Sequence, residues 1–566
     1  MGEEEECRHK TDQFEPIAID RQPVIEFLRP PFLSPRERAR FGPPLTEVPI
    51  LARTYSAALH GIDGYPVTVE IDLRPGLPAF SIVGLPDAGV RESRERVVAA
   101  VKNAGFSFPV QKITVNLAPG DIRKEGPAFD FAIAMGILAA AGVVSEASLA
   151  GRAFIGELGL NGDLRPVNGV LPCAIGLKKA GFTDLLTSTA NAAEACLVDG
   201  LSVFAATNLS DTVAFLRGEL AWGPTSVDRE VVFRQAREYG VDFSDVKGQA
   251  FAKRALEIAA AGGHNVLMIG PPGSGKTLLA RRLPTILPDM HFDEALETTK
   301  IHSVAGHLRD SRAMVATRPF RSPHHQISDV ALVGGGSNPR PGEVSLAHRG
   351  ILFLDEFPEF SRSVLESLRQ PLEDRFVTIA RIANSVRYPS DFLLIAAANP
   401  CPCGYLGSTR RACICTQPTV QKYRARLSGP LIDRIDLHVE VPSLTIDEIA
   451  GDAVRSESSA DIRARVGAAR DIQGRRLRHH GLFENGQMGV RHIRAFCGLE
   501  PEARRMIRQA IHRLGLSARA YDRILRVSRT IADLENVEQI LPAHVAEAIG
   551  YRLLDRDPAA NAGGDL

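Results

Sequence analysis

The 566-residue sequence has no excess charge of either sign: lysine and arginine together number 67, and so do aspartate and glutamate. A protein that coats nucleic acid along its whole length usually carries a basic excess, so any site for a polyanion here must be local. No internal repeat and no low-complexity tract is visible. These absences favour a globular protein with confined binding sites.

Long hydrophobic runs are also missing. The longest apolar stretch, Phe131 to Val144, contains two glycines and is too short to span a bilayer. The first ten residues are acidic and polar, which does not resemble a secretory signal. With 44% hydrophobic and 24% charged residues, the composition is that of a soluble globular protein. We therefore expect a cytoplasmic protein with no membrane partner.

Cysteine is scarce, and its distribution is uneven. Four of the eight cysteines crowd into fifteen residues, as two C-x-C pairs formed by Cys401, Cys403, Cys413 and Cys415. Four thiolates at this spacing match the ligand set of a structural Zn²⁺ site, although C-x-C is tighter than the commoner C-x-x-C. The alternative is four free thiols in a loop. The pattern predicts zinc at 401–415.

The length predicts two to four domains. Residues 1–50 lack sustained periodicity and are interpreted as a disordered leader, and residues 556–566 as a disordered tail. Alternating strands and intervening helices in 51–222 predict an α/β domain, and a polar connector separates it from a second α/β region at 226–445. Residues 446–555 are predicted to be helical. The fold class is therefore α/β with a helical C-terminal part.

The clearest motif follows a predicted buried strand, Asn265–Ile269, and precedes a helix predicted from Thr277. It consists of Gly270, Pro271, Pro272, Gly273, Ser274, Gly275, Lys276 and Thr277. Glycines at these positions let backbone N–H groups point at phosphate oxygens, the lysine reaches the β- and γ-phosphates, and the threonine ligates Mg²⁺. A Gly-rich turn without a ligand is the alternative. The motif predicts binding of ATP and Mg²⁺.

Polar residues at the ends of two further predicted strands fit the same chemistry. Asp355 and Glu356 end the strand Gly350–Asp355, where the first would hold the Mg²⁺ shell and the second would polarise the attacking water. Asn399 follows the strand Asp391–Ala396, in a position to contact the γ-phosphate. The alternatives are a helix-capping acidic pair and a turn-forming asparagine before proline.

Two arginines are candidates for stabilising charge at the γ-phosphate. Arg434 lies in the segment Ser428–Asp436, and an arginine from a neighbouring subunit commonly stabilises the transition state. Arg519 begins a helical run within an arginine-rich stretch and is a candidate second phosphate sensor. The alternative for this stretch is a solvated helix face.

Together these segments resemble the ComM/YifB family of Mg-chelatase-like AAA+ proteins, over nearly everything from Leu51 to Asp555. The resemblance is carried by the Walker motifs and by Gly84–Asp87, Lys124–Gly126, Arg321–His325, Asn399–Gly404 and Ser428–His438. It implies a homo-hexameric DNA motor for helicase or branch-migration work in natural transformation and recombination, with recombination proteins as possible partners. It also implies that Asn399 is the sensor 1 residue, Arg434 the arginine finger and Arg519 the sensor 2 arginine of the C-terminal lid.

Two predicted hairpins are candidates for contacts with single-stranded or branched DNA. The segment Arg375–Arg387 resembles the pre-sensor hairpin that faces the pore of helicase-like AAA+ rings, so Arg381 and Arg387 are candidate phosphate contacts. The second is the insert from Arg321 to Gly342, whose Gly334–Gly336 would permit a mobile tip. Ordinary surface hairpins are the alternative for both.

The segment from Ala52 to about Leu216 resembles the Lon-type protease domain but lacks its chemistry. Ala128 stands where the nucleophilic serine should be, and Leu171 replaces the partner lysine. We therefore predict a non-proteolytic docking module. Two other functions remain open, an ATPase subunit of a metal chelatase and an ATP-dependent unfoldase or protease-like protein.

Overall fold

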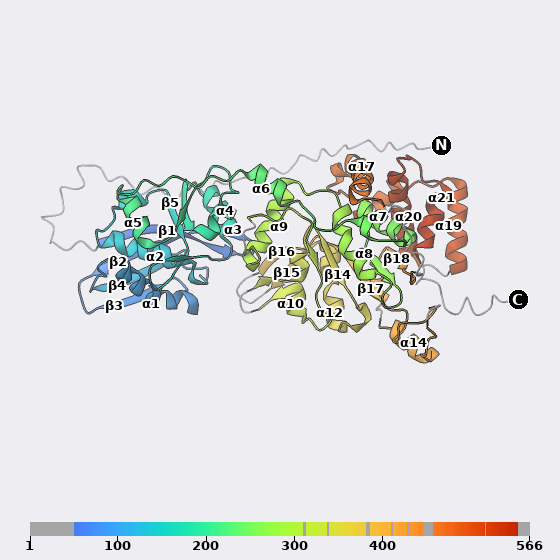
Figure 1. Ribbon diagram of the computed structural model, residues 1–566, viewed down its shortest axis with the longest axis horizontal. Helices are drawn as coiled ribbons and strands as arrows, with labels where there is room; N and C mark the ends of the chain where they lie inside the picture. Colours follow the sequence, from blue (N-terminus) through green and yellow to red (C-terminus); the bar gives the residue numbers. More distant parts are fainter. Residues whose placement is uncertain are drawn as a thin grey trace, which may run out of the picture. The chain divides into compact units, whose positions relative to one another are not determined.

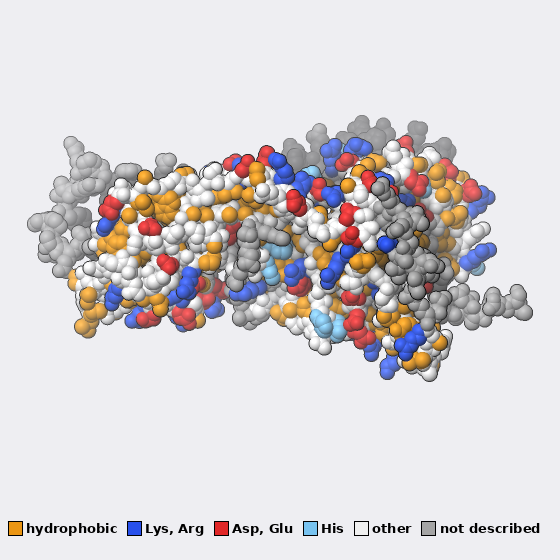
Figure 2. Space-filling view, in the orientation of Figure 1, with side chains coloured by type: hydrophobic (Ala, Val, Ile, Leu, Met, Phe, Trp, Pro, Cys, Tyr) orange, Lys and Arg blue, Asp and Glu red, His pale blue; other side chains and the backbone are white. Residues whose placement is uncertain are grey.

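The computed structural model describes residues 50–308, 313–336, 339–380, 385–408, 411–426, 429–444, 457–514 and 517–552, and the statements below concern these residues. The fold class predicted from the sequence, α/β with a parallel-sheet core, is confirmed. No helix among these residues is long and apolar enough to cross a membrane. On the face seen in Figure 2, acidic and basic side chains are intermixed.

The N-terminal part contains a four-stranded sheet in the order β1-β2-β4-β3, formed by β1 (Ile50–His60), β2 (Asp63–Arg74), β4 (Lys112–Ala118) and β3 (Ala79–Val83). Burial alternates along β2 and β4, because successive side chains of a strand point to opposite faces. The buried face meets α2 (Asp130–Ala140), which is apolar all round, and α1 (Ala88–Asn103) packs on α2. Strands and helices thus alternate in this region, as the sequence predicts for 51–222.

A second, three-stranded parallel sheet completes this part, in the order β5-β8-β9. Its strands are β5 (Arg152–Ile155), β8 (Asp184–Ser188) and β9 (Ser202–Ala206). The helices around it are α3 (Val170–Lys179), α4 (Thr189–Ala195) and α5 (Leu209–Leu216), and β6 (Glu157–Leu158) pairs with β7 (Leu164–Arg165).

The central part is built on a five-stranded parallel sheet in the order β11-β14-β17-β10-β18, of which β14, β17 and β18 are labelled in Figure 1. Its strands are β11 (Phe320–Arg321), β14 (Ile351–Leu354), β17 (Leu393–Ala398), β10 (Val266–Ile269) and β18 (Leu437–Glu440). Both β14 and β17 are buried along their whole length, as expected for a parallel sheet covered on both faces. Helices α7 (Ala250–Gly262), α8 (Lys276–Arg282) and α9 (Phe292–Ala305) accompany it. The sequence predicted β10, β14 and β17 but did not predict β11 or β18.

Two hairpins lie on the central part, as the sequence predicts. Strands β15 (Phe376–Ala380) and β16 (Ser385–Pro389) pair antiparallel, and β12 (Gly334–Gly335) pairs with β13 (Arg340–Pro341). Short helices α10 (Asp329–Val333), α11 (Glu343–Leu346), α12 (Arg362–Ser367) and α13 (Arg369–Asp374) connect them to the sheet. The two hairpins contact each other through β12 and β15.

The C-terminal part is helical. Its helices are α17 (Ser459–Leu477), α18 (Val490–Phe496), α19 (Pro501–Leu514), α20 (Ala518–Leu534) and α21 (Pro542–Gly550). Their apolar faces share one hydrophobic core with α7 and β10. Polar contacts reinforce this packing: Arg470 donates to the Ala260 carbonyl and Gln473 to the Ala261 carbonyl, at the end of α7. The helical segment is thus fastened to the helix that enters the central sheet.

Candidate functional site

The Gly-rich segment 270–275 forms the turn between β10 and α8. Gly270 lies so close to the Val441 carbonyl that a Cβ would stand 2.1 Å from its oxygen. Gly275 has a φ of 92°, in the left-handed region that suits glycine, and it caps α8. Two glycines of the predicted P-loop are therefore required by the backbone itself.

Lys276 is buried at the start of α8, and its Nζ lies inside this turn. It donates to the carbonyls of Gly270 at 2.7 Å and Pro271 at 2.9 Å, and lies 3.4 Å from the Oδ1 of Asn399. Burial lowers the pKa of Lys276, and the nearby Asp355 carboxylate opposes that shift. The turn thus holds a buried cation beside backbone amides, as binding of a phosphate group requires.

The carboxyl ends of three parallel strands bring the predicted residues together. Lys276 and Thr277 follow β10, Asp355 follows β14, and Asn399 follows β17. The Thr277 hydroxyl donates to the Oδ2 of Asp355 at 2.8 Å. Two neighbouring oxygen ligands of an octahedral Mg²⁺, each at about 2.05 Å, stand about 2.9 Å apart. The spacing of these two oxygens therefore fits a shared Mg²⁺, and their roles remain the prediction made from the sequence.

Glu356 directly follows Asp355 and has a φ of 52°. Its backbone N–H donates to the Oδ1 of Asp355 at 2.9 Å. Its carboxylate Oε2 lies 3.1 Å from the Nδ1 of His325, in the insert between β11 and β12. Sequence reasoning included His325 only in a motif that supports the family resemblance and missed this contact. No local signal links two residues that are 31 positions apart in the chain and lie on different elements.

Arg434 lies near the amino ends of the strands of the central sheet, whereas Lys276 lies near their carboxyl ends. Its backbone carbonyl accepts from the Nδ2 of Asn265, the residue just before β10, and its guanidinium pairs with Glu373. Arg519 pairs with Asp433 at 2.8 Å, next to Arg434 in the chain, and its side chain is 71% exposed. The two predicted arginines thus lie near the amino ends of the strands and away from the P-loop of their own chain.

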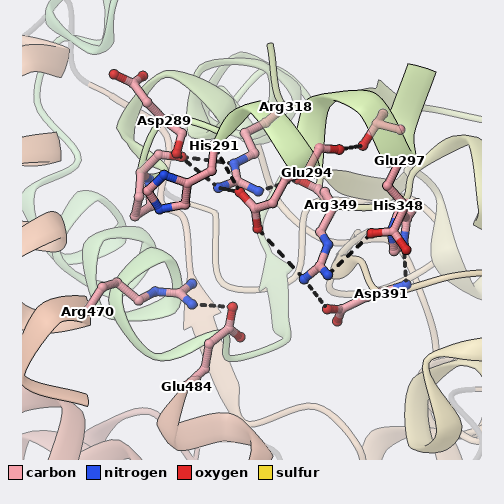
Figure 3. A network of polar contacts seen from close by, with 12 residues as sticks. Asp289, His291, Glu294, Glu297, Arg318, His348, Arg349, Asp391, Arg470 and Glu484 are labelled. Carbon is pink, nitrogen blue, oxygen red and sulfur yellow. Dashed lines mark hydrogen bonds and ion pairs between the residues drawn. The ribbon is translucent and has the colours of Figure 1, made fainter. Parts of the chain in front are cut away.

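A cavity of about 910 Å³ opens beside the amino ends of these strands. Arg434 lines it together with Asn265, Arg318, Arg349, Arg470 and Glu484. Figure 3 shows the polar network along its wall, in which Arg349 pairs with Asp391 at 3.1 Å and with Glu297 at 3.4 Å. Arg318 donates to the Arg349 carbonyl at 3.1 Å. These contacts join α9 to the segments that precede β11, β14 and β17.

The four clustered cysteines face one another next to the P-loop. Their sulfur atoms all lie within 4.8 Å of each other, with 3.4 Å from Cys401 to Cys403 and 3.6 Å from Cys403 to Cys413. Four sulfurs at 2.3 Å from a tetrahedral Zn²⁺ stand about 3.8 Å apart. Hydrogen bonds from the backbone of Tyr405 and Ile414 lower the pKa of Cys403 to about 6, whereas the neighbouring Cys403 and Cys401 side chains raise the pKa of Cys415 to about 12. The donor set therefore fits Zn²⁺.

The cysteine loop also touches the nucleotide turn. A Cβ on Gly404 would lie 2.6 Å from the Pro272 side chain and 3.9 Å from Asn399. Because Gly404 lies directly after Cys403, the shape of the cysteine loop and the position of the P-loop are coupled by contact.

The candidate DNA contacts are placed only in part. Arg381 lies outside the described residues. Arg387 lies on β16, and its guanidinium covers the ring of Phe376 at 3.2 Å from the centroid. Its role in binding DNA remains a prediction.

Ala128 and Leu171, which depart from the protease pattern, both lie in the N-terminal part. Ala128 is in a short 3-10 helix, Pro127–Phe129, and Leu171 lies fully buried on α3. Leu171 belongs to an apolar cluster with Met290 and Ala295 of the central part. The neighbouring buried Glu194 accepts from the Ser303 hydroxyl of α9 at 2.7 Å. Leu171, which stands at the position of the missing lysine, thus packs against the central part.

A five-stranded parallel sheet with the phosphate-type turn after β10, acidic residues after β14 and a helical C-terminal segment define a P-loop ATPase of the AAA+ type. Family models agree: "Magnesium chelatase, subunit ChlI" matches residues 242–449, "Subunit ChlI of Mg-chelatase" matches 69–191, and "Magnesium chelatase, subunit ChlI C-terminal" matches 456–552.

Similar proteins extend over almost the whole chain. "Competence protein ComM" of Haemophilus influenzae is 44% identical over 511 residues, which cover 89% of this chain and 98% of that protein. "Uncharacterized protein YifB" of Escherichia coli is 42% identical over 507 residues, with the same coverage. "Magnesium-chelatase subunit ChlI" of Mesostigma viride is 21% identical over 351 residues, 56% of this chain and 88% of that protein. The chain belongs to the ComM/YifB family of Mg-chelatase-like AAA+ ATPases.

Proposed function

We propose that the chain is an ATP-driven motor that acts on single-stranded or branched DNA as a homo-hexamer, in natural transformation and homologous recombination. The observation that carries this proposal is the separation of Arg434 from the nucleotide turn of its own chain. The four residues of β10 span about 13 Å, with Lys276 beyond one end and Asn265, which bonds to Arg434, before the other. An arginine so placed would serve the nucleotide of a neighbouring chain.

The surroundings of Arg434 support a shared site. Arg519 pairs with Asp433, the residue before Arg434, so both arginines lie near the amino ends of the strands. The cavity at this edge offers a neighbouring copy a concave, charged surface whose wall is stiffened by the network in Figure 3. A closed ring would repeat this contact head to tail, which is the geometry of cyclic oligomers. A hexamer is the ring size that the family resemblance implies.

At each site the residues of two chains would divide the chemistry. Lys276 and the amides of segment 270–275 would bind the β- and γ-phosphates, and Thr277 and Asp355 would hold Mg²⁺. Bound Mg²⁺ would supply charge neutralisation between the phosphates. Glu356 would take a proton from the attacking water, Asn399 would orient it, and Arg434 of a neighbouring chain would stabilise charge on the γ-phosphate.

Support for DNA comes from a relative's name and from two hairpins. The relative named a competence protein is 44% identical over most of both chains, so a role in competence is carried over here as a proposal. The insert and the β15–β16 hairpin contact each other and carry the exposed Arg387. In a ring these hairpins would face the pore, where basic side chains bind phosphates.

A chelatase-type ATPase is the second candidate, favoured by the match to a magnesium-chelatase subunit along 88% of that protein's length. A protease-like activity lacks its nucleophile and base at Ala128 and Leu171. Steady-state ATPase rates without DNA, with single-stranded DNA and with a four-way junction separate the two remaining candidates. A motor requires stimulation by DNA, and equal rates in all three conditions would refute it.

A further inference from the structure

Exposed arginines gather on the C-terminal helices, although the chain as a whole carries no excess charge. Arginines of α17 that face other helices are paired: Arg465 pairs with Glu257 of α7 at 2.7 Å, and Arg476 with Asp533 of α20 at 2.5 Å. Six exposed arginines of the C-terminal part have no acidic partner among the residues that the structure describes. We call them the basic surface: Arg478, Arg491, Arg494, Arg504, Arg505 and Arg508.

Helix α19 presents three of these arginines on one face. At 3.6 residues per turn, Arg504, Arg505 and Arg508 fall within an arc of about 100°. The other side of the helix is apolar, and its Ala503 and Ile507 are buried in the core that α19 shares with α7 and β10. Packing of the apolar side therefore leaves the arginines in solvent. Figure 2 shows basic side chains at the edge of the molecule where Figure 1 labels α19.

The same three arginines border a cavity of about 450 Å³, which Leu499 and Pro501 complete. Within the described part of the chain, no carboxylate lines this cavity. Guanidinium groups that share a cavity without a counter-charge repel one another, and an anion bound among them offsets the repulsion. Arginine binds phosphate through paired N–H donors, so the cavity fits phosphate groups.

Helix α18 and the segment before it extend the basic surface. The 3-10 helix Arg478–His480 packs on α18, since the ring of His480 lies 5.1 Å from the ring of His492. Helix α18 carries the exposed Arg491 and Arg494. Four residues separate its end from the start of α19. The arginines of the two helices thus belong to one stretch of the C-terminal part.

The chemistry of the basic surface favours the backbone of duplex DNA over a single strand. Proteins that bind single strands combine basic side chains with exposed aromatic rings on which the bases stack. Helix α19 contains no Phe, Tyr or Trp, and the partly buried Phe496 of α18 already meets the ring of His480 at 5.7 Å. Arginines without stacking rings bind phosphates irrespective of base sequence, which is how proteins hold a duplex by its backbone.

We propose that the basic surface binds the phosphate backbone of a duplex arm of the DNA, apart from the strand at the hairpins. The inference rests on the proposed DNA function and adds a second contact of a different kind. Because α19 and α20 share one hydrophobic core with α7 and β10, a duplex bound there is attached to the part of the chain that binds ATP. The motor would hold a duplex arm while it moves the strand at the hairpins.

The test measures binding of DNA to full-length protein by fluorescence anisotropy, with a short blunt duplex and one of its single strands, at several salt concentrations. In the triple variant Arg504→Gln, Arg505→Gln, Arg508→Gln, the slope of log affinity against log salt for the duplex should become shallower by about 2 to 3, since each phosphate contact contributes about 0.9. The slope for the single strand should not change. The DNA-free ATPase rate should equal that of wild type, because none of the three arginines belongs to the ATP site.

Two controls separate charge at this surface from other effects. Lysine at the same three positions keeps the charges and should keep the slope for the duplex. The triple variant Arg91→Gln, Lys102→Gln, Lys112→Gln removes the same charge from exposed positions of the N-terminal part and should also keep it. If the α19 variant does not fold, Arg491→Gln with Arg494→Gln gives the same test on α18, with a slope shallower by about 2.

An unchanged slope for the duplex in the folded glutamine variants overturns the inference and leaves an acidic protein as the occupant of the basic surface. Equal losses for the single strand and the duplex overturn the assignment to duplex DNA. If wild type binds neither DNA, the proposed motor function fails as well. If wild type binds both and the glutamine variants bind both equally well, only this inference fails.

Discussion

Thr277 and Asp355 are hydrogen-bonded at 2.8 Å although they follow strands that are not neighbours in the sheet. Strand β17 lies between β10 and β14, and Asn399, at its end, completes the row beside Lys276. The contact therefore reaches across one strand at the carboxyl edge, where ligands of open α/β sheets bind. It brings the two predicted Mg²⁺ ligands to one place.

We expect Lys276→Ala to abolish tight binding of ATP. The Nζ of Lys276 lies inside the nucleotide turn, where it donates to the carbonyls of Gly270 and Pro271. Titration with a fluorescent ATP analogue measures the affinity. Lys422→Ala, which removes an exposed lysine on α14 (Gln417–Arg424), is the control and should bind normally. Wild-type affinity in the Lys276 variant would contradict the assignment.

We expect Glu356→Gln to bind ATP and to turn it over about 10²- to 10⁴-fold more slowly, because only proton abstraction from water is lost. Single-turnover assays with radiolabelled ATP should detect intact ATP on the protein. The control is Glu359→Gln, a carboxylate three residues away that pairs with Arg426. Normal turnover in the Glu356 variant would assign the base to another residue.

We expect one Zn²⁺ per chain, bound by Cys401, Cys403, Cys413 and Cys415. Replacing Cys401 and Cys403 together by Ser should remove the metal and lower the melting temperature, since metal binding contributes to local folding. Elemental analysis of the purified protein measures the metal. Cys196→Ser replaces a thiol that is hydrogen-bonded to the Thr225 carbonyl, and this variant should keep the full metal content. Wild-type protein without zinc would end this prediction.

Much of the central fold follows from local sequence signals. Buried strands such as Ile351–Leu354 are apolar throughout, and the glycines at 270 and 275 are required by close approach and by a left-handed φ. Lys276, Asp355 and Asn399 could be assigned to strand ends because each follows an apolar run. Their meeting at the carboxyl ends of the strands depends on the three strands being parallel members of one sheet, which the motif context implies.

The contacts that the sequence did not reveal are long-range. Nothing local pairs His325 with Glu356, since each position is compatible with many partners until the insert folds back over the sheet. Strands β11 and β18 are too short and too mixed for a pattern to predict them; β11 has two residues. Arg434 lies at the amino ends of the strands because it precedes β18, which runs parallel to β10, and the sequence did not predict that strand.

The wall of the cavity in Figure 3 should lose stability in acid. A hydrogen bond from His348, with added attraction from Arg349, lowers the pKa of Glu297 from 4.5 to about 2. A carboxyl whose pKa is lowered by folding stabilises the protein fully above its unfolded value, and this contribution is lost as the pH falls from 4.5 toward 2. We therefore expect the melting temperature of wild type to exceed that of Glu297→Gln at pH 7 and the difference to vanish across this window.

Calorimetry at several pH values measures that difference. Glu95→Gln, a substitution of a largely exposed carboxylate on α1, should show almost no difference at any pH. A gap between wild type and Glu297→Gln that stays constant from pH 7 to pH 2 would contradict the role of the charged Glu297.

The last prediction concerns the division of the ATP site between two chains. If Arg434 serves a neighbour, Arg434→Ala should bind ATP almost normally and lose about 10³- to 10⁵-fold in rate, the usual contribution of such arginines. Lys276→Ala should be inactive for a different reason, the loss of ATP binding. When the two variants are mixed, some interfaces combine an intact nucleotide turn with an intact arginine from the adjacent chain, so part of the activity should return.

Subunit exchange must be verified in that mixture, for example by energy transfer between chains carrying different fluorophores. The matched control mixes Lys276→Ala with Glu356→Gln, because both substitutions lie at the same edge of the sheet as the nucleotide turn and no interface in such a ring has a complete site from that edge. That mixture should stay inactive. If exchanged rings of Arg434→Ala and Lys276→Ala remain as inactive as either parent, Arg434 does not act across the subunit boundary. Its position beside Asn265, at the far end of β10 from Lys276, would then require a large movement within one chain before it could reach the γ-phosphate.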